Sequence, residues 1–565
     1  AKSRAAAFLP TTRADMDARG WDQLDILIIT GDAYVDHPAF GPVLIARFLE
    51  GRGFKVGIIA QPKWDSPADL CRMGAPRLYV GIAAGNLDSM LNKLTAQKKT
   101  RGEDQYSPGG DTGHRPNRAS IVYSNLVRQG MPGTPIVLGG IEASLRRIAH
   151  YDYWEDKVRR SILLDAKADL LVFGMGERPA WEIARRLDAG ESIDALVNVR
   201  GTAHVKTNRR LWEPLLADKS RFTTDGKLLV LPSYEEVVKS KEAFAKMSRL
   251  FQYETNPHNG RPLLQPHGDQ AVYFNPPALP LSEGEMDGLY DLPFTRLPHP
   301  SYTDVIPAFE TVKHSIVTMR GCFGGCTFCS ITEHEGRIIQ SRSEDSIIQE
   351  IEDIRDKVKG FTGTISDLGG PTANMYRLGC RSPEIEAACR KPSCVYPGIC
   401  QNLTTDHGPL IKIYRRGRAL KGIKKILIGS GLRYDLAVKS PEYVKELVQQ
   451  RGASIHELVQ EKPGSREFGK DGDEEIDVRL HGGGRHPADV HGPVEEFGAG
   501  RGEGAAAGRG DARGRGGDVD DAGPGAGGGR HDEGGDRLPP EGGGRAQPGS
   551  EQQEDVLADG DLGRP

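Results

Sequence analysis

The sequence predicts an α/β protein with two domains followed by a glycine-rich tail. Short apolar runs alternate with amphipathic segments from Leu24 to about Ala189, and a similar alternation resumes at Ser315. A strand followed by a helix, repeated at this spacing, indicates a parallel sheet covered by helices on both faces. The glycines separate the tail from the rest, because 26 of the 71 lie in residues 481–565.

The first series, residues 1–200, predicts a Rossmann-like domain. Its five apolar runs are predicted strands, at Leu24–Thr30, Lys55–Ala60, Arg77–Ala84, Pro135–Gly139 and Asp169–Phe173. The helical candidates are Gly41–Glu50, Leu87–Ala96, Ser120–Arg128 and Arg178–Leu187. Ligands of such sheets lie beyond the carboxyl ends of the strands. The polar loops at residues 31–37, 139–142 and 174–177 are therefore candidate ligand contacts, although each is also consistent with an ordinary turn.

Residues 201–310 are predicted to connect the two series. A helix near Ser233–Phe251 begins with a capping box, in which Glu236 follows Ser233 by three positions. Seven prolines between Pro276 and Pro307 oppose regular structure and predict an extended linker. The second series occupies residues 311–450, with predicted strands at Ser315–Thr318, Thr362–Ser366 and Lys424–Gly429 and a predicted helix at Ser343–Lys359.

Charge and hydropathy narrow the classes of function. The net charge is −4, but residues 481–565 carry 9 Arg, no Lys and 17 Asp and Glu, so the first 480 residues carry +4. This mildly basic body indicates neither a nucleic-acid specialist nor a membrane-surface binder. No apolar run approaches the roughly 18 residues of a membrane span, and residues 1–4 lead into no stretch of signal-peptide type. A cytoplasmic location is expected.

Seven of the eight cysteines fall between positions 322 and 400, and three of them form a compact motif. Cys322, Cys326 and Cys329 follow the predicted strand at Ser315 with the spacing C-x3-C-x2-C. Such crowding in a large chain without an export signal indicates metal or cluster ligation. Three thiolates can hold three irons of a [4Fe–4S] cluster. The fourth iron is then open to chelate S-adenosylmethionine (SAM), whose reductive cleavage frees a 5′-deoxyadenosyl radical.

A zinc site is the alternative at this loop. His334 follows the last of the three cysteines closely enough for Cys322, Cys326, Cys329 and His334 to close a Cys3His tetrahedron. The segment would then belong to a zinc-stabilised binding module without catalysis. The glycines of the loop favour the cluster, because close wrapping of backbone around it needs positive φ and free N–H groups. These glycines are Gly321, Gly324 and Gly325.

The cysteine loop resembles the signature of radical SAM enzymes, and the chain is identified as a member of their YgiQ-like family. The resemblance covers about Phe8 to Gln450. It implies a radical SAM enzyme with an unassigned substrate and a one-electron donor such as flavodoxin or ferredoxin. The segments that carry it are Phe8–Thr12 (FLPTT), Gly31–Pro38 (GDAYVDHP), Gly139–Ser144 (GGIEAS), Cys322–Cys329 (CFGGCTFC), Asp367–Tyr376 (DLGGPTANMY) and Gly429–Asp435 (GSGLRYD).

The resemblance also implies the architecture of the second domain and its cofactor contacts. It implies an incomplete TIM-like barrel with the cluster at its open end, where the carboxyl ends of barrel strands place catalysis. Radical SAM enzymes receive the amino group of SAM on a Gly-Gly motif after the second barrel strand. Gly369, Gly370 and Pro371 match that motif, with Asp367 nearby. Phe328 is expected to pack on the adenine, and the further expected cofactor or substrate contacts are Ser430, Arg433 and Tyr434.

Four further cysteines, Cys380, Cys389, Cys394 and Cys400, follow at irregular spacing. They are consistent with an auxiliary iron–sulfur cluster, with a zinc ion, or with reduced and partly buried thiols. Cys71 stands alone in the first series and is expected to be structural.

Two radical SAM groups with an N-terminal Rossmann-like domain are alternatives. Cobalamin-dependent methyltransferases carry the motif Asp-x-His-x-x-Gly at the first strand–helix turn, where the His ligates cobalt. Here Asp36 and His37 are adjacent and Gly41 is four positions after the His, so the spacing disfavours cobalamin. Methylthiotransferases that act on transfer RNA carry three N-terminal cysteines, and this chain has only Cys71 there.

Residues 451–565 depart from the family pattern. They grow steadily richer in Gly, Arg, Ala, Asp and Pro, whose codons are GC-rich. The prediction is that the reading frame is lost near codon 450, so that part of the barrel is missing. The alternative is a genuine low-complexity tail that is disordered because it has little apolar surface to bury.

Overall fold

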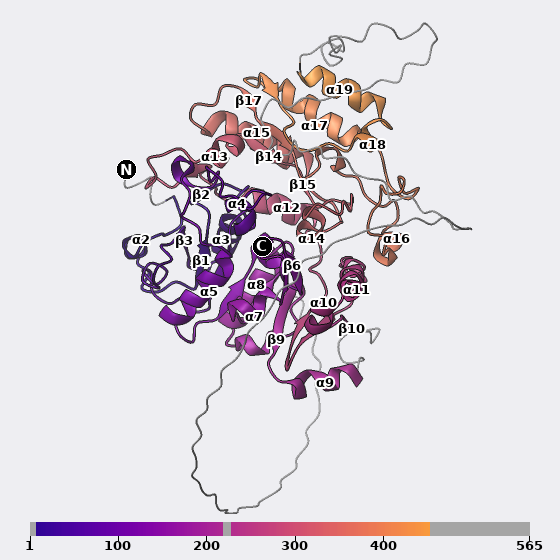
Figure 1. The fold of residues 1–565 in the computed structure, drawn as a ribbon. Coiled ribbons are helices and arrows are strands. Elements are labelled where there is room, and N and C mark those ends of the chain that lie inside the picture. The colour runs from indigo at the N-terminus through magenta and orange to yellow at the C-terminus, as the bar shows by residue number, and fades with distance from the viewer. Residues whose placement is uncertain (1–6, 218–227, 452–565) are drawn as a thin grey trace, which may run out of the picture. The chain divides into compact units, whose positions relative to one another are not determined.

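The computed structural model describes residues 7–217 and 228–451, and its largest element is a nine-stranded sheet (Figure 1). The strand order is β10-β11-β12-β9-β8-β5-β4-β1-β3. Five neighbouring strands run parallel and are the five that the sequence predicts: β3 (Val56–Ala60), β1 (Ile26–Thr30), β4 (Tyr79–Ala83), β5 (Ile136–Leu138) and β8 (Leu170–Val172).

The parallel strands are apolar on both faces because helices cover both faces. All five residues of β1 are buried, and Ile26 pairs in register with Val56 on one side and Tyr79 on the other. Helices α3 (Gly41–Glu50) and α8 (Glu177–Asp188) contribute to the core on one face, and α5 (Ala119–Gly130) contributes to the core on the other. The predicted helix at Leu87–Ala96 is shorter, as α4 (Ser89–Lys93).

The order of the parallel strands creates a switch point at the carboxyl edge of the sheet. Counted along the chain, the five strands lie in the order 2-1-3-4-5, so the connections leave β1 and β4 in opposite directions. In doubly wound sheets ligands bind outside the carboxyl ends at such a point. The edge beyond β1 and β4 is therefore where the fold itself places a ligand.

The sheet continues past residue 200, which corrects the expected connecting region. Four strands complete the sheet: β9 (Thr202–Lys206), β10 (Leu229–Val230), β11 (Leu263–His267) and β12 (Gln270–Phe274). Strand β9 runs antiparallel to both β8 and β12. Residues 201–217 and 228–274 thus extend the first domain instead of leaving it.

Two further expectations for this region were wrong in detail. The helix near Ser233–Phe251 is two helices, α10 (Tyr234–Lys239) and α11 (Lys241–Gln252), because Ser240 is extended and caps the second. The predicted capping box of Ser233 and Glu236 is present. The proline-rich segment is not extended throughout, since it contains α12 (Glu283–Tyr290), a stretch without proline. Prolines thus flank this helix without entering it.

The second series forms two short parallel strand pairs packed under helices. Strand β14 (Ser315–Val317) pairs with β18 (Asp367–Gly369), and β17 (Thr364–Ile365) pairs with β19 (Lys425–Ile426). The helices α15 (Glu344–Lys357), α17 (Gly408–Ala419) and α19 (Pro441–Arg451) lie together beside them (Figure 1). These pairs have the parallel βα pattern that was expected, and the TIM-like barrel stays a prediction.

Two points concern the chain as a whole. Within residues 7–217 and 228–451, no helix is long and apolar enough to cross a bilayer. The glycine-rich tail, with its predicted frame loss or disorder, lies outside the described residues.

Candidate active site

The three-cysteine loop lies between the short strand β15 (Met319–Arg320) and the helix α14 (Ile331–Glu335). Gly321 and Gly325 have φ of 88° and 64°, which confirms the expected positive φ at these two glycines but not at Gly324. A Cβ at Gly321 would overlap the Ile338 carbonyl oxygen, and one at Gly325 would overlap that of Pro392. The loop therefore has its shape only with glycine at these positions.

Hydrogen-bond donors surround two of the three sulfur atoms. The Gly324 N–H donates to Cys322 Sγ at 3.4 Å, and Thr372 Oγ1 lies 3.7 Å from the same sulfur. Arg433 Nη1 donates to Cys326 Sγ at 3.5 Å. Burial raises the pKa of the Cys322 thiol, while the hydrogen bonds with the Gly324 N–H and with Thr372 act in the opposite direction. Such donors favour thiolate, which is the form that ligates metal.

The Gly-Gly segment lies where the sequence predicts, at the end of β18. A Cβ at Gly369 would be 2.5 Å from Ser430 Oγ, and one at Gly370 would be 2.6 Å from the Met319 carbonyl oxygen. Real Cβ atoms do not approach so closely, so neither position can carry a side chain without a shift of its neighbours. The two glycines thus bring β18 against both β15, the strand before the cysteine loop, and the loop after β19.

The Asp367 side chain is hydrogen-bonded to Gly429 and Ser430 and not to the cysteine loop. Its carboxylate accepts hydrogen bonds from the N–H groups of Gly429 and Ser430 at 2.8 and 3.2 Å, and from Ser430 Oγ at 2.5 Å. Burial raises the pKa of this carboxyl. Asp367 therefore positions Ser430 beside the Gly-Gly segment.

The remaining expected cofactor contacts are more exposed. Phe328 is 91% exposed and Tyr434 is 52% exposed. Arg433 forms an ion pair with Asp435 as well as reaching Cys326. Packing of Phe328 on an adenine ring therefore stays a prediction.

A cavity of about 550 Å³ lies between the carboxyl edge of the sheet and the second series. One wall carries two of the three expected loops, 139–142 and 174–177, through Gly139 to Ile141 and Gly174 to Glu177, whereas no residue of the loop at 31–37 lines the cavity. The opposite wall is formed by residues of the predicted cofactor site, namely Asp367, Gly369, Gly370, Pro371 and Ser430. The cavity thus joins the switch-point edge of the sheet to the Gly-Gly segment.

A buried ion pair ties the cysteine loop to the sheet. Arg320, two residues before Cys322, donates to Glu177 Oε1 at 2.5 Å and to the Tyr290 hydroxyl at 3.2 Å. Both charged side chains are at most 10% exposed. Glu335 Oε2 also accepts from the Gly321 N–H at 3.0 Å and so holds the start of the loop.

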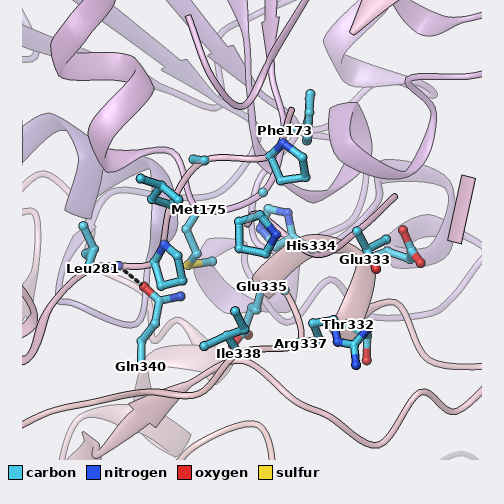
Figure 2. Close-up of a pocket in the computed structure, with 18 of the residues that line it drawn as sticks. Phe173, Met175, Leu281, Thr332, Glu333, His334, Glu335, Arg337, Ile338 and Gln340 are labelled. Atoms are coloured by element: carbon cyan, nitrogen blue, oxygen red, sulfur yellow. Dashed lines mark hydrogen bonds between the residues drawn. The ribbon is translucent and has the colours of Figure 1, made fainter. Parts of the chain in front are cut away.

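His334 does not complete a zinc site with the cysteines. Its Nδ1 lies 3.0 Å from the hydroxyl of Ser144, which belongs to helix α6 (Gly140–Leu145) of the sheet domain. His334 lines a small cavity of about 70 Å³ together with Phe173 and Met175 (Figure 2). In the part of the chain that the structure describes, no three His, Cys, Asp or Glu side chains are close enough to hold one metal ion. The Cys3His alternative therefore lacks its geometry.

Other sequence expectations have mixed outcomes. His37 is buried, but it is not among the residues that line the large cavity, and its Nδ1 accepts from the Ala39 N–H at 3.1 Å. Cys71 packs against the core of the sheet domain, as expected. Cys380, Cys389, Cys394 and Cys400 are brought together around one cavity.

Three features of the site were not predicted from the sequence, namely Arg320, Thr372 and the specific role of Glu177. Arg320 stands two residues before the first cysteine and Thr372 directly follows the Gly-Gly-Pro segment, so proximity to the motifs was the available signal. Glu177 lies in a loop that was predicted to matter, but its partner is 143 residues away.

Comparison with known proteins gives the family of this chain. A family model described as "Radical SAM N-terminal" matches residues 8–315. A UPF0313 protein of Pseudomonas aeruginosa is 54% identical over 491 residues, with 78% of this chain and 66% of the relative covered. A UPF0313 protein of Bradyrhizobium diazoefficiens is 56% identical over 453 residues, with 79% and 67% covered. The chain spans slightly less than two thirds of the length of the Pseudomonas relatives.

Solved structures give weaker likenesses. The radical SAM methyltransferase TsrM from Kitasatospora setae, with tryptophan substrate and a SAM analog bound, is 15% identical with a TM-score of 0.29, covering 61% of this chain and 47% of that one. The cobalamin-dependent SAM radical enzyme OxsB is 10% identical with a TM-score of 0.38, covering 77% and 43%. TM-scores this low do not establish a common fold.

The sequence relatives establish the family of this chain, whereas the solved structures do not. The family match covers more than half of the chain, and the identity to the relatives exceeds 50% over most of it. The chain belongs to the YgiQ-like, or UPF0313, family of the radical SAM superfamily.

Proposed function

We propose that this chain is a radical SAM enzyme that holds a [4Fe–4S] cluster on Cys322, Cys326 and Cys329. The observation that carries the proposal is the convergence of two distant segments on this loop. Thr372 Oγ1 lies 3.7 Å from Cys322 Sγ, and Arg433 Nη1 lies 3.5 Å from Cys326 Sγ. When bound, the cluster supplies the electron that splits the sulfur–carbon bond of SAM and frees a 5′-deoxyadenosyl radical.

The protein's own groups then hold the loop and the cofactor. Gly324, Thr372 and Arg433 donate toward the sulfur atoms and stabilise them as thiolates. Gly369 and Gly370 leave backbone uncovered at the end of β18, where the amino group of SAM would be received, and Pro371 follows them. Ser430, held by Asp367, offers a hydroxyl on the same wall.

The cavity of about 550 Å³ is the proposed substrate chamber. Its lining combines apolar side chains such as Ile28, Leu44 and Val317 with the glycine-rich loops of the sheet. A pocket of this kind buries a mostly apolar molecule and orients it with few polar groups. A small one-electron donor protein such as flavodoxin or ferredoxin is the proposed partner.

The test is anaerobic reconstitution of the full chain with iron and sulfide. The expected result is brown protein with the charge-transfer absorbance of an iron–sulfur cluster, which forms 5′-deoxyadenosine from SAM only when a reductant is present. The Cys71→Ala variant is the control for loss of a thiol outside the site and is expected to behave like the natural sequence. Colourless protein with stoichiometric zinc would contradict the proposal.

A further inference from the structure

The second group of cysteines surrounds a cavity of its own. Cys380, Cys389, Cys394 and Cys400 all line one cavity of about 390 Å³. All four thiols are free. Four cysteines of a 21-residue segment therefore meet at one place although their spacing is irregular.

Different local structures bring these four residues to the cavity. Cys380 lies in an isolated β-bridge, and Cys389 caps the carboxyl end of helix α16 (Pro383–Ala388). The Cys400 N–H donates to the Cys394 carbonyl oxygen at 2.8 Å, which holds the last two cysteines together. The grouping is thus a product of tertiary structure, since no single turn or helix could produce it.

Basic side chains balance the charge that thiolates would bring. Arg337 is only 8% exposed, and its Nη2 lies 3.6 Å from Cys389 Sγ. Arg390 and Lys391 also line the cavity, against the single carboxylate of Glu386. A cluster bound by four thiolates is an anion, and the buried guanidinium of Arg337 beside it offsets part of the cost of its desolvation.

The size of the cavity distinguishes a cluster from a single ion. Zinc–sulfur bonds are about 2.3 Å long, so four thiols around zinc converge on one point. Within the described residues, no three His, Cys, Asp or Glu side chains are close enough for that. We propose that Cys380, Cys389, Cys394 and Cys400 ligate a second [4Fe–4S] cluster in the 390 Å³ cavity, with one cysteine on each iron.

Four ligands give this second site a different chemistry from the first. With every iron bound to a cysteine, no iron is open to chelate the amino and carboxylate groups of SAM. The second cluster is therefore insensitive to SAM, and it binds whether or not the three-cysteine loop holds the catalytic cluster.

The two sites share a wall. Phe323, next to Cys322, lines the second cavity, and its carbonyl oxygen accepts from the Cys394 N–H at 3.0 Å. Ser393 Oγ donates to the Gly324 carbonyl oxygen at 2.7 Å. Assembly of the second site thus also supports the backbone of the three-cysteine loop.

Iron counting on two matched variants of the full chain tests the proposal. One variant removes the first group, as Cys322→Ala with Cys326→Ala and Cys329→Ala, and the other removes part of the second, as Cys389→Ala with Cys394→Ala. After anaerobic reconstitution, the natural sequence is expected to hold about eight irons and eight sulfides per chain, and each variant about four. The electron paramagnetic resonance signal of the reduced triple variant should not change when SAM is added.

The outcomes separate this proposal from the proposed function. A triple variant without any cluster, or a natural sequence with only about four irons, overturns the second site. A double variant that binds no cluster and forms no 5′-deoxyadenosine, while the triple variant keeps its cluster, overturns the proposed function instead. Circular dichroism of both variants, and the iron content of Cys71→Ala as a fold-preserving control, distinguish lost ligation from lost folding.

Discussion

The two cysteine groups of this molecule differ in how the chain assembles them. The first group occupies residues 322–329, one loop between a strand and a helix, where glycines shape the backbone. The second spreads over residues 380–400 and needs a helix end, a β-bridge and a turn to bring its members together. The compact spacing of the first group predicts a cluster from the sequence, whereas the irregular spacing of the second leaves several alternatives open, and only the fold brings its members to one cavity.

The side chains and cavities that surround the two cysteine groups also differ. Arg433 and Thr372 approach the first group from the side of the Gly-Gly segment, which lines the 550 Å³ cavity. The second group lines a smaller cavity of its own together with the basic Arg337. Three ligands next to a substrate-sized cavity suit catalysis, and four ligands around a separate cavity suit a cluster that binds nothing else.

Removal of one thiol from each group should produce the largest difference. We expect Cys326→Ala to reduce reductant-dependent 5′-deoxyadenosine to the level without protein, because the catalytic cluster loses a ligand. Cys394→Ala should leave cleavage measurable, because its thiol serves the other site. The measurement is chromatography of 5′-deoxyadenosine after anaerobic reconstitution. An equal loss of 5′-deoxyadenosine in both variants would contradict the proposed division into a catalytic group and a second group.

An arginine ion pair also connects each group to the sheet domain. We expect the two ion pairs to contribute different amounts to the free energy of unfolding. Arg320 is the ion-pair partner of buried Glu177, whereas Arg390 shares Glu254 with Arg261. Arg320→Met should lower the free energy of unfolding by about 3–5 kcal/mol, because it leaves a buried carboxylate uncompensated.

Arg390→Met is the matched variant, and we expect a cost of only about 1 kcal/mol because Glu254 keeps its second arginine and because Arg390 is 37% exposed. Denaturant unfolding at neutral pH measures both values. A larger effect for Arg390→Met would mean that the second group depends more on the sheet domain than the first does.

The glycines offer a comparison of backbone packing in the two groups. Gly370→Ala should cost about 1–3 kcal/mol, because its Cβ would lie 2.6 Å from the Met319 carbonyl oxygen. Gly398→Ala in the second group is the control, since a Cβ there would meet nothing within 4 Å. Unfolding midpoints and equilibrium binding of SAM would report the effect. Unchanged SAM binding in Gly370→Ala would remove the Gly-Gly segment from the cofactor site.

Parts of the fold were predictable where local pattern and burial agree. Strand β1 is apolar throughout because helices cover both faces of the sheet, and α3 has the predicted bounds Gly41–Glu50. Strands β11 and β12 were missed, although the two-residue turn at Gly268, which has φ of 65°, was a usable hairpin signal. The surrounding prolines obscured it.

The residues of the candidate site also divide into those that the sequence predicts and those that it does not. Cys322, Cys326 and Cys329 follow from spacing alone, because neighbouring residues on one loop cannot lie far apart. The contact of Arg433 with Cys326 joins positions 107 residues apart, and that of Arg320 with Glu177 joins positions 143 apart. The first contact depends on how the second series folds and the second on how the two series pack, and no local pattern encodes either.

The smallest predicted difference concerns pH, because the first group is attached through a histidine, which titrates, and the second through an amide, which does not. His334 contacts Ser144, whereas the Asn256 amide donates to the Cys389 carbonyl oxygen at 2.8 Å in the second group. Burial and the nearby Arg147 lower the pKa of His334 to about 4. An exposed histidine has a pKa of about 6.5.

Between these two pKa values the unfolded chain binds a proton on His334 that the folded chain does not. The contribution of His334 to stability is therefore full above about pH 6.5 and is lost as the pH falls toward 4. We expect His334→Asn, which can keep a hydrogen bond to Ser144, to reduce the loss of stability between about pH 7 and about pH 5.5 by about 1 kcal/mol in denaturant unfolding. Asn256→Ala should leave the pH dependence unchanged, and an equal change in both variants would show that the two attachments do not differ in titration.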